Sequence, residues 1–104
     1  MAMIELMKCA ELGDQEIRRF ELDGRPPIAL YNLGGDYFAT DDTCTHGEAS
    51  LAEGDIEGDE IFCPFHMGAF NIRNGEATVP PCVKPLNSYP VRIVGDTVCI
   101  ELES

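Results

Sequence analysis

The sequence predicts an all-β fold, and three observations lead to that prediction. Turn signals recur at short intervals, at Asp23-Gly24, Gly34-Gly35, Gly58-Asp59, Asn74-Gly75 and Gly95-Asp96. Runs rich in β-branched and aromatic residues lie between these turns. No segment repeats its apolar residues at the spacing of about 3.6 that marks an amphipathic helix. Short strands joined by regular turns are typical of a barrel or a sandwich.

Three strands are expected in the first half of the chain. Residues 17–22 form the first of them. Residues 28–33 and 37–40 stand on either side of the glycine pair Gly34-Gly35. Two strand-like runs around a short glycine turn predict a β-hairpin.

Four strands are expected in the second half. Residues 61–62 and 69–72 give two short ones. Residues 89–94 and 97–102 flank a Gly-Asp turn and predict a second hairpin. In residues 97–102, apolar and more polar side chains alternate, which predicts a strand with one buried face.

Length and charge limit the classes of protein that this chain can represent. Its 104 residues predict one domain, residues 1–104. The 19 acidic residues against 7 basic ones, net charge −12, argue against nucleic acid and anionic membranes as partners. No apolar run reaches the roughly 20 residues of a membrane helix, and the first residues lack the basic start of a secretory signal. We therefore expect a cytoplasmic monomer that binds neither membrane nor nucleic acid.

Residues 43–82 differ from the segments on either side. They are rich in glycine, contain both histidines and end near Pro80-Pro81. This composition predicts a group of loops inserted on a β scaffold, where functional residues tend to lie. Within it, the acidic stretch 53–60 is expected to form a solvated loop, with the steering of a basic partner as the alternative.

Each of the two histidines lies close to a cysteine. The two motifs are Cys44-Thr-His46 and Cys63-Pro-Phe-His66. Residues so close in sequence can turn toward one site only if the backbone between them loops, and a glycine, Gly47 or Gly68, follows each pair. The five cysteines are odd in number, which favours ligands or thiols over disulfides. Together the motifs predict one site with two thiolates and two imidazoles.

Two kinds of metal centre use this set of ligands. A structural zinc ion is bound by two cysteines and two histidines in many small domains, although zinc motifs usually pair Cys with Cys and His with His. Here each segment supplies one of each. That arrangement favours a [2Fe–2S] cluster, with Cys44 and Cys63 on one iron and His46 and His66 on the other.

These motifs resemble the signature of the Rieske proteins. Residues 37–47 and 61–70 are similar to the soluble Rieske ferredoxins of bacterial aromatic ring-hydroxylating dioxygenases, most of all the biphenyl and naphthalene type. The similarity covers essentially the whole chain, including the Tyr-Pro-Val-Arg-Ile segment before the last strand.

The resemblance implies a fold, a cofactor and two partners. The fold would be the Rieske fold, three antiparallel sheets with a small cluster-binding subdomain, residues 43–82, at the tip. The cofactor would be one [2Fe–2S] cluster per chain, covered by a proline-containing loop that Pro80-Pro81 matches. The protein would be an electron carrier rather than an enzyme. It would accept single electrons from a flavin-containing, NADH-dependent ferredoxin reductase and pass them to the terminal Rieske oxygenase of an aromatic-ring dioxygenase system.

The chain also departs from the respiratory Rieske proteins, which resemble it in their ligands. Those proteins have a disulfide between the two ligand loops, and the matching positions here are Ala49 and Phe65. Gly68 stands where they have a hydroxyl donor. Fewer hydrogen bonds to the cluster predict a reduction potential near the low end of the Rieske range, roughly −150 mV.

Several residues outside the ligand set have two possible roles. Cys82 either lies near the cluster or is a plain buried thiol, while Cys9 and Cys99 are expected to be packing residues. Met67 is either an apolar docking residue or an ordinary surface methionine. Phe65 and Phe70 are expected to shield the cluster from water.

Three other functions compete with electron transfer. The catalytic subunit of a Rieske oxygenase needs a second iron with two histidines and a carboxylate, and this sequence has two histidines, both in the cysteine motifs. The small subunit of an assimilatory nitrite reductase has a related fold but can lack the ligands. The presence of all four candidate ligands in this sequence argues against that alternative. A structural zinc module would be colourless.

Overall fold

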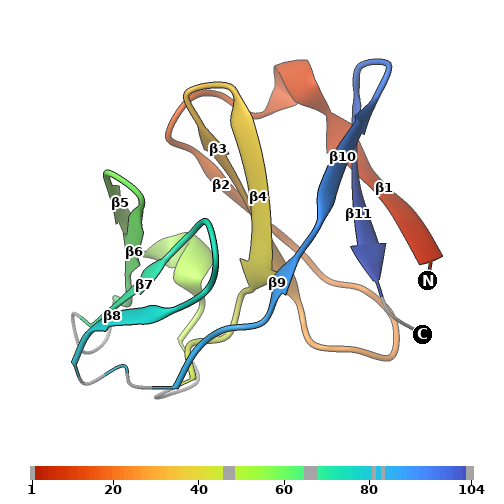
Figure 1. The fold of residues 1–104 in the computed structure, drawn as a ribbon. Coiled ribbons are helices and arrows are strands. Elements are labelled where there is room, and N and C mark those ends of the chain that lie inside the picture. Colours follow the sequence, from red (N-terminus) through yellow and green to blue (C-terminus); the bar gives the residue numbers. More distant parts are fainter. Residues whose placement is uncertain (1, 46–48, 65–67, 81, 83, 103–104) are drawn as a thin grey trace.

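The computed structural model describes residues 2–45, 49–64, 68–80, 82 and 84–102, and this part of the chain forms three antiparallel sheets (Figure 1). Two short 3-10 helices, Cys9–Glu11 and Leu51–Glu53, accompany them. The predictions of an all-β fold and of three antiparallel sheets are confirmed. Within the described residues, no helix is long and apolar enough to cross a membrane.

The first sheet has the strand order β1 (Ala2–Lys8), β11 (Thr97–Leu102), β10 (Val91–Val94). The hairpin of β10 and β11 confirms the prediction around Gly95-Asp96. Strand β1 was not among the expected strands. Its Ala, Met, Glu, Leu and Lys residues have high helix propensity. Pairing along β11, from Ala2 opposite Leu102 to Lys8 opposite Thr97, outweighs that propensity.

The second sheet has the order β2 (Ile17–Phe20), β3 (Ile28–Leu33), β4 (Asp36–Asp41), β9 (Ser88–Tyr89). The hairpin of β3 and β4 around the two glycines confirms the prediction. The single strand expected over residues 89–94 is wrong, because Pro90 divides it. Proline has no N–H to donate to a sheet, and on its two sides β9 pairs with β4 while β10 pairs with β11.

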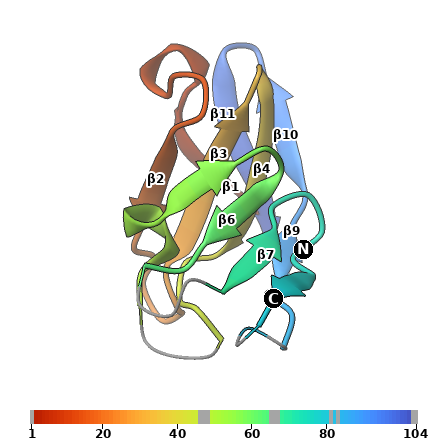
Figure 2. The same cartoon turned by 90° about the vertical axis from the view of Figure 1, so that its left-hand side faces the viewer.

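The third sheet contains four short strands, β5 (Asp55–Glu57), β6 (Glu60–Phe62), β7 (Ala69–Asn71) and β8 (Ala77–Val79). It lies at one end of the molecule, on the side of the second sheet away from β1, β10 and β11 (Figures 1 and 2). The solvated loop expected in the acidic stretch is therefore wrong for residues 55–60. Those residues form a hairpin that turns at Gly58, whose φ is +62°. The acidic side chains alternate with Ile56 and with Ile61, which is fully buried.

The residues of β3 supply two hydrophobic cores. Ile28 and Leu30 face the first sheet, in a base core with Leu12, Ala39, Val98, Ile100 and Leu102. Ala29, Tyr31 and Leu33 face the third sheet and the loops around it. They belong to a site core that also contains Cys44, Ala49, Leu51, Ile61, Cys63, Phe70, Ile72, Cys82 and Leu86. Successive side chains of a strand point to opposite faces, so all six residues of β3 are buried because both faces are covered.

A buried hydroxyl pair lies on the site-core side of the second sheet. Thr40 Oγ1 donates its one hydrogen to the carbonyl of Asp41, at 2.9 Å. The hydroxyl of Tyr31 lies 2.8 Å from Thr40 Oγ1 and therefore acts as the donor between them. Burial is the main reason that the pKa of Tyr31 is raised above its ordinary value.

The chain leaves the second sheet after β4 and returns to it at β9, beside the point where it left. Thr40 pairs with Ser88, and Ala39 pairs with Tyr89. The N–H of Asp41 donates to the carbonyl of Asn87 at 3.0 Å, and the Asn87 amide donates back to the Asp41 carboxylate at 3.0 Å. Residues 42–86, with the third sheet and both cysteine motifs, thus lie between two adjacent chain ends.

Candidate functional site

The first cysteine motif begins a closed loop directly after β4. Thr43 forms an isolated bridge with Ser50, and the N–H of Cys44 donates to the carbonyl of Ala49 at 3.0 Å. The Cys44 side chain is 3% exposed and belongs to the site core. The cysteine of the first motif is thus held in the site core by a backbone hydrogen bond.

The second motif begins a loop of the same kind between β6 and β7. The N–H of Cys63 donates to the carbonyl of Gly68 at 2.7 Å. Cys63 is fully buried. In both loops the cysteine N–H donates to the carbonyl of the fifth residue after it. This backbone hydrogen bond joins the two ends of the loop, here called its neck, and fixes the cysteine there.

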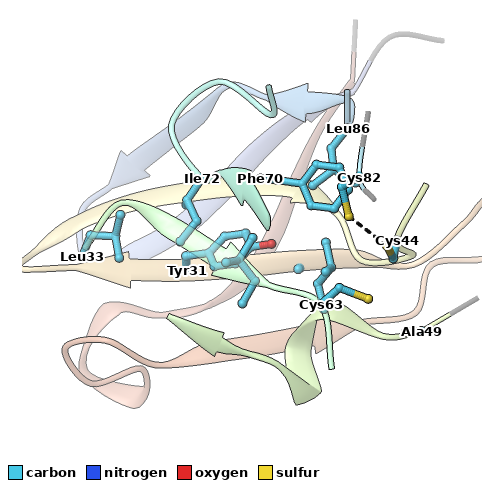
Figure 3. Packing of buried hydrophobic residues seen from close by; sticks show 12 residues of the cluster. Tyr31, Leu33, Cys44, Ala49, Cys63, Phe70, Ile72, Cys82 and Leu86 are labelled. Carbon is cyan, nitrogen blue, oxygen red and sulfur yellow. Dashed lines mark hydrogen bonds between the residues drawn. The ribbon is translucent and has the colours of Figure 1, made fainter. Parts of the chain in front are cut away.

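Three sulfur atoms lie in the site core, at the end opposite Leu33 (Figure 3). The Sγ atoms of Cys44 and Cys82 are 3.8 Å apart. Cys82 is 3% exposed, and its pKa is raised to about 12. Burial is the largest cause, followed by the hydrogen bond with Cys44 and by the charges of Cys44 and Cys63. Cys82 is therefore a buried thiol and also lies beside a predicted ligand.

Two of the four predicted ligands, His46 and His66, lie outside the described residues, as do Gly47, Phe65, Met67 and Pro81. Their roles stay predictions. Within the described ranges there is no group of three or more His, Cys, Asp and Glu side chains that could hold a metal ion.

The other cysteines lie away from the site core. Cys99 is buried in β11, and Cys9 packs partly buried against the base core. Cys9 thus packs as expected, whereas Cys99 is buried but belongs to neither of the two cores. Phe70, expected as a shield, is fully buried in the site core with Cys44 and Cys63.

Asp42 is a buried carboxylate that the sequence analysis missed. It is 1% exposed and lies two residues before Cys44. Its carboxylate accepts hydrogen bonds from the Ser50 hydroxyl at 2.6 Å and from the N–H of Ala52 at 2.9 Å, and it lies 3.6 Å from Nε of Arg19. A buried charge is stable only when it is paired and hydrogen-bonded. Asp42 therefore connects the two ends of the first loop. In the sequence, the only indication of this role is that an acidic residue stands two positions before Cys44.

The segment after β8 contacts both loops. The hydroxyl of Thr45, in the first loop, donates to the carbonyl of Lys84 at 2.7 Å. Gly68, at the end of the second loop, lies against Cys82: a Cβ at position 68 would come within 2.5 Å of the Cys82 Sγ and 3.0 Å of the Val79 carbonyl oxygen. Position 68 therefore requires glycine because the segment approaches so closely.

The described residues fit an iron–sulfur cluster. Thiolates are the protein ligands of such clusters, and two cysteines stand at the necks of matched loops in one apolar core. Leu51, Ile61 and Phe70, all fully buried, surround them with hydrocarbon and limit access of water. Ala49, which is buried, occupies the neck of the first loop without a sulfur.

Comparison with known proteins agrees with this geometry. A family model described as the Rieske [2Fe-2S] domain matches residues 2–90. The chain is 40% identical over 101 residues to the ferredoxin component of the p-cumate 2,3-dioxygenase system of Pseudomonas putida, which covers 96% of this chain and 86% of the relative. It is 39% identical over 103 residues to the ferredoxin component of biphenyl 2,3-dioxygenase of Rhodococcus jostii (strain RHA1), over 99% of this chain and 95% of the relative.

A solved structure gives the same result for the fold. It is described as a complex of reduced oxygenase and oxidized ferredoxin in carbazole 1,9a-dioxygenase. One of its chains matches with a TM-score of 0.92 and 39% identity, over 97% of this chain and 97% of the matched one.

Proposed function

The chain belongs to the Rieske [2Fe–2S] domain family, and on this premise we propose that it is the ferredoxin component of an aromatic-ring dioxygenase system. It carries single electrons and does not itself transform a substrate. The observation that carries the proposal is the pair of buried cysteines, Cys44 and Cys63, each at the neck of a closed loop, in a chain whose full-length relatives are dioxygenase ferredoxins.

The proposed ligands are Cys44 and Cys63 on one iron and His46 and His66 on the other. The burial of both cysteines in one core supports the first pair, and the spacing of each histidine from its cysteine supports the second. When bound, the [2Fe–2S] cluster takes up and releases one electron, at a potential that two imidazole ligands raise above that of a four-cysteine cluster.

The chain's own residues hold the ligands in place and keep water away. The two neck hydrogen bonds, the Asp42 carboxylate and the Thr45 hydroxyl fix the loops against the third sheet and the segment after β8. These contacts join the loops to the rest of the protein through backbone and side-chain hydrogen bonds. A site held in this way needs little rearrangement during electron exchange.

The proposed boundary of the cluster-binding subdomain is residues 43–82. All four strands of the third sheet and both cysteine motifs fall within it. Its side chains pack on one face of β3, so the subdomain shares a core with the second sheet.

The proposed partners are a flavin-containing, NADH-dependent ferredoxin reductase and a terminal Rieske oxygenase. A structure similar to this chain contains an oxygenase bound to a ferredoxin, which supports the second partner. A net charge of −12 favours partners with a basic docking face. The cytoplasm is the proposed compartment, because NADH supplies the electrons there.

The test is to purify the protein with its cofactor and titrate it. We expect two irons and two sulfides per chain, a red-brown colour that bleaches on reduction, and a rhombic EPR signal typical of mixed Cys and His ligation. A catalytic amount of reductase with NADH should reduce the protein, and addition of oxygenase should reoxidise it. Cys44→Ala, His46→Ala, Cys63→Ala and His66→Ala should each abolish the signal, while Cys99→Ala should keep it. A colourless protein that contains zinc would overturn the proposal.

A further inference from the structure

Cys82 contacts a proposed cluster ligand although it belongs to neither cysteine motif. Its Sγ lies 3.8 Å from the Sγ of Cys44, and each of the two side chains is 3% exposed (Figure 3). This distance is within the range of a hydrogen bond between two sulfur atoms, and either sulfur could be the donor when both are thiols. The contact joins residues 38 positions apart in the sequence.

The direction of this hydrogen bond follows from the role of Cys44. A cysteine that binds iron does so as a thiolate, which has no hydrogen and can only accept. Cys82 has no place in the proposed ligand set, so it keeps its S–H. With Cys44 as a ligand, the hydrogen bond must run from Cys82 to Cys44.

Contacts on other sides hold the Cys82 thiol in this position. The N–H of Cys82 donates to the carbonyl of Val79 at 3.2 Å, which forms a turn after β8. Gly68 lies so close that a Cβ there would come within 2.5 Å of the Cys82 Sγ. Phe70 and Leu86 belong to the same buried site core as Cys82. The sulfur is therefore confined between Gly68 and Cys44.

We propose that Cys82 is a positioning residue for electron transfer, whose S–H donates to the Cys44 sulfur and raises the reduction potential of the cluster. A hydrogen bond to a ligand sulfur favours the reduced form, because reduction adds negative charge to the cluster and strengthens the bond. The proposal rests on the proposed function, since it assumes that Cys44 binds iron. It identifies Cys82, which lies outside both cysteine motifs, as a further position that affects the reduction potential of the cluster.

The test compares the holoproteins of the wild type, Cys82→Ala, Cys82→Ser and Cys99→Ala in a redox titration followed by EPR. Cys82→Ala removes the donor, and we expect the equilibrium constant for one-electron reduction to fall by about threefold to tenfold, where tenfold corresponds to about 59 mV. Cys82→Ser restores a donor and should recover most of the potential. Cys99→Ala, which also removes a buried thiol but far from the site core, should keep the wild-type potential.

A spectroscopic measurement on the wild type makes the test independent of any variant's folding. Resonance Raman bands of the iron–cysteine stretches should shift when the protein is exchanged from H₂O into D₂O, and Cys82→Ala should reduce the shift. Wild-type potential in Cys82→Ala, or the absence of any deuterium shift in the wild type, would show that Cys82 is a packing residue only. Such a result leaves the proposed function intact, whereas a protein without an iron–sulfur EPR signal would overturn the proposed function itself.

Discussion

The carboxylate of Asp42 accepts a hydrogen bond of 2.6 Å from the hydroxyl of Ser50, across the base of the first ligand loop. One residue thus connects the end of β4 to the residue that follows the loop. The same carboxylate also binds the N–H of Ala52. The first motif is therefore held at its base by hydrogen bonds to one buried carboxylate.

We expect Asp42→Ala to lower the free energy of unfolding by about 2–4 kcal/mol, because it leaves the Ser50 hydroxyl and the Ala52 N–H without their buried acceptor. Urea denaturation measures the loss, and the visible spectrum reports whether the cluster is retained. Asp55→Ala, at an exposed carboxylate of β5, serves as control and should change stability by less than about 0.5 kcal/mol. Equal effects of the two variants would show that Asp42 does not hold the loop.

Gly68→Ala should destabilise the protein by about 1–3 kcal/mol, because its methyl group would overlap with the Cys82 sulfur and press on the Val79 carbonyl. The double variant Gly68→Ala with Cys82→Ala removes the sulfur and should lose less than the sum of the two single changes. Thermal unfolding of the four proteins gives the coupling. Strict additivity would contradict the close packing of these two residues.

The stability of the protein should fall at alkaline pH, and Tyr31 should contribute to that fall. Because burial raises its pKa in the folded protein, the stabilisation is complete below the unfolded pKa of about 10. It is lost as the pH rises from there toward the folded pKa. Tyr31→Phe should flatten the dependence of the unfolding free energy between about pH 9 and 11. The same slope in the variant and the wild type would argue against a buried, protonated phenol.

Replacing a buried isoleucine by alanine should affect the spectra of the cluster in one core and not in the other. Ile61→Ala in the site core and Ile100→Ala in the base core both remove a fully buried side chain, and each should cost about 2–5 kcal/mol. Only Ile61→Ala should also change the visible and EPR spectra, because Ile61 packs in the same core as Cys44 and Cys63. Identical spectra in both variants would mean that the site core does not influence the cluster.

Much of the fold could be predicted from local patterns in the sequence. Glycine turns between apolar runs identified both long hairpins, since such patterns are decided within a few residues. Strand β1 could not be found this way, because its residues favour a helix and only pairing with β11, at the other end of the chain, makes it a strand. The hairpin at Gly58 was not predicted because its acidic residues suggested a solvated loop, although they alternate with the partly buried Ile56 and the fully buried Ile61.

The site could be predicted only in part, for a related reason. Cys44 and Cys63 belong to short motifs that can be read directly. Asp42 and Cys82 act through contacts with Ser50 and Cys44. The contact of Cys82 spans 38 positions, and no local pattern distinguishes this thiol from an ordinary buried one.

The adjacency of β4 and β9 has a consequence for how such proteins diversify. Because the chain departs at Asp41 and returns at Asn87, hydrogen-bonded to each other, everything between them can be exchanged as a cassette by recombination. A transplanted cassette has to match one face of the second sheet, formed by Ala29, Tyr31 and Leu33 of β3 with Ile17 of β2 and Phe38 of β4. The base core lies on the opposite face and contains no residue of the cassette, so the exchange would leave its packing unchanged. Chimeras cut at these two points could therefore inherit the redox properties of one parent and the thermal tolerance of the other.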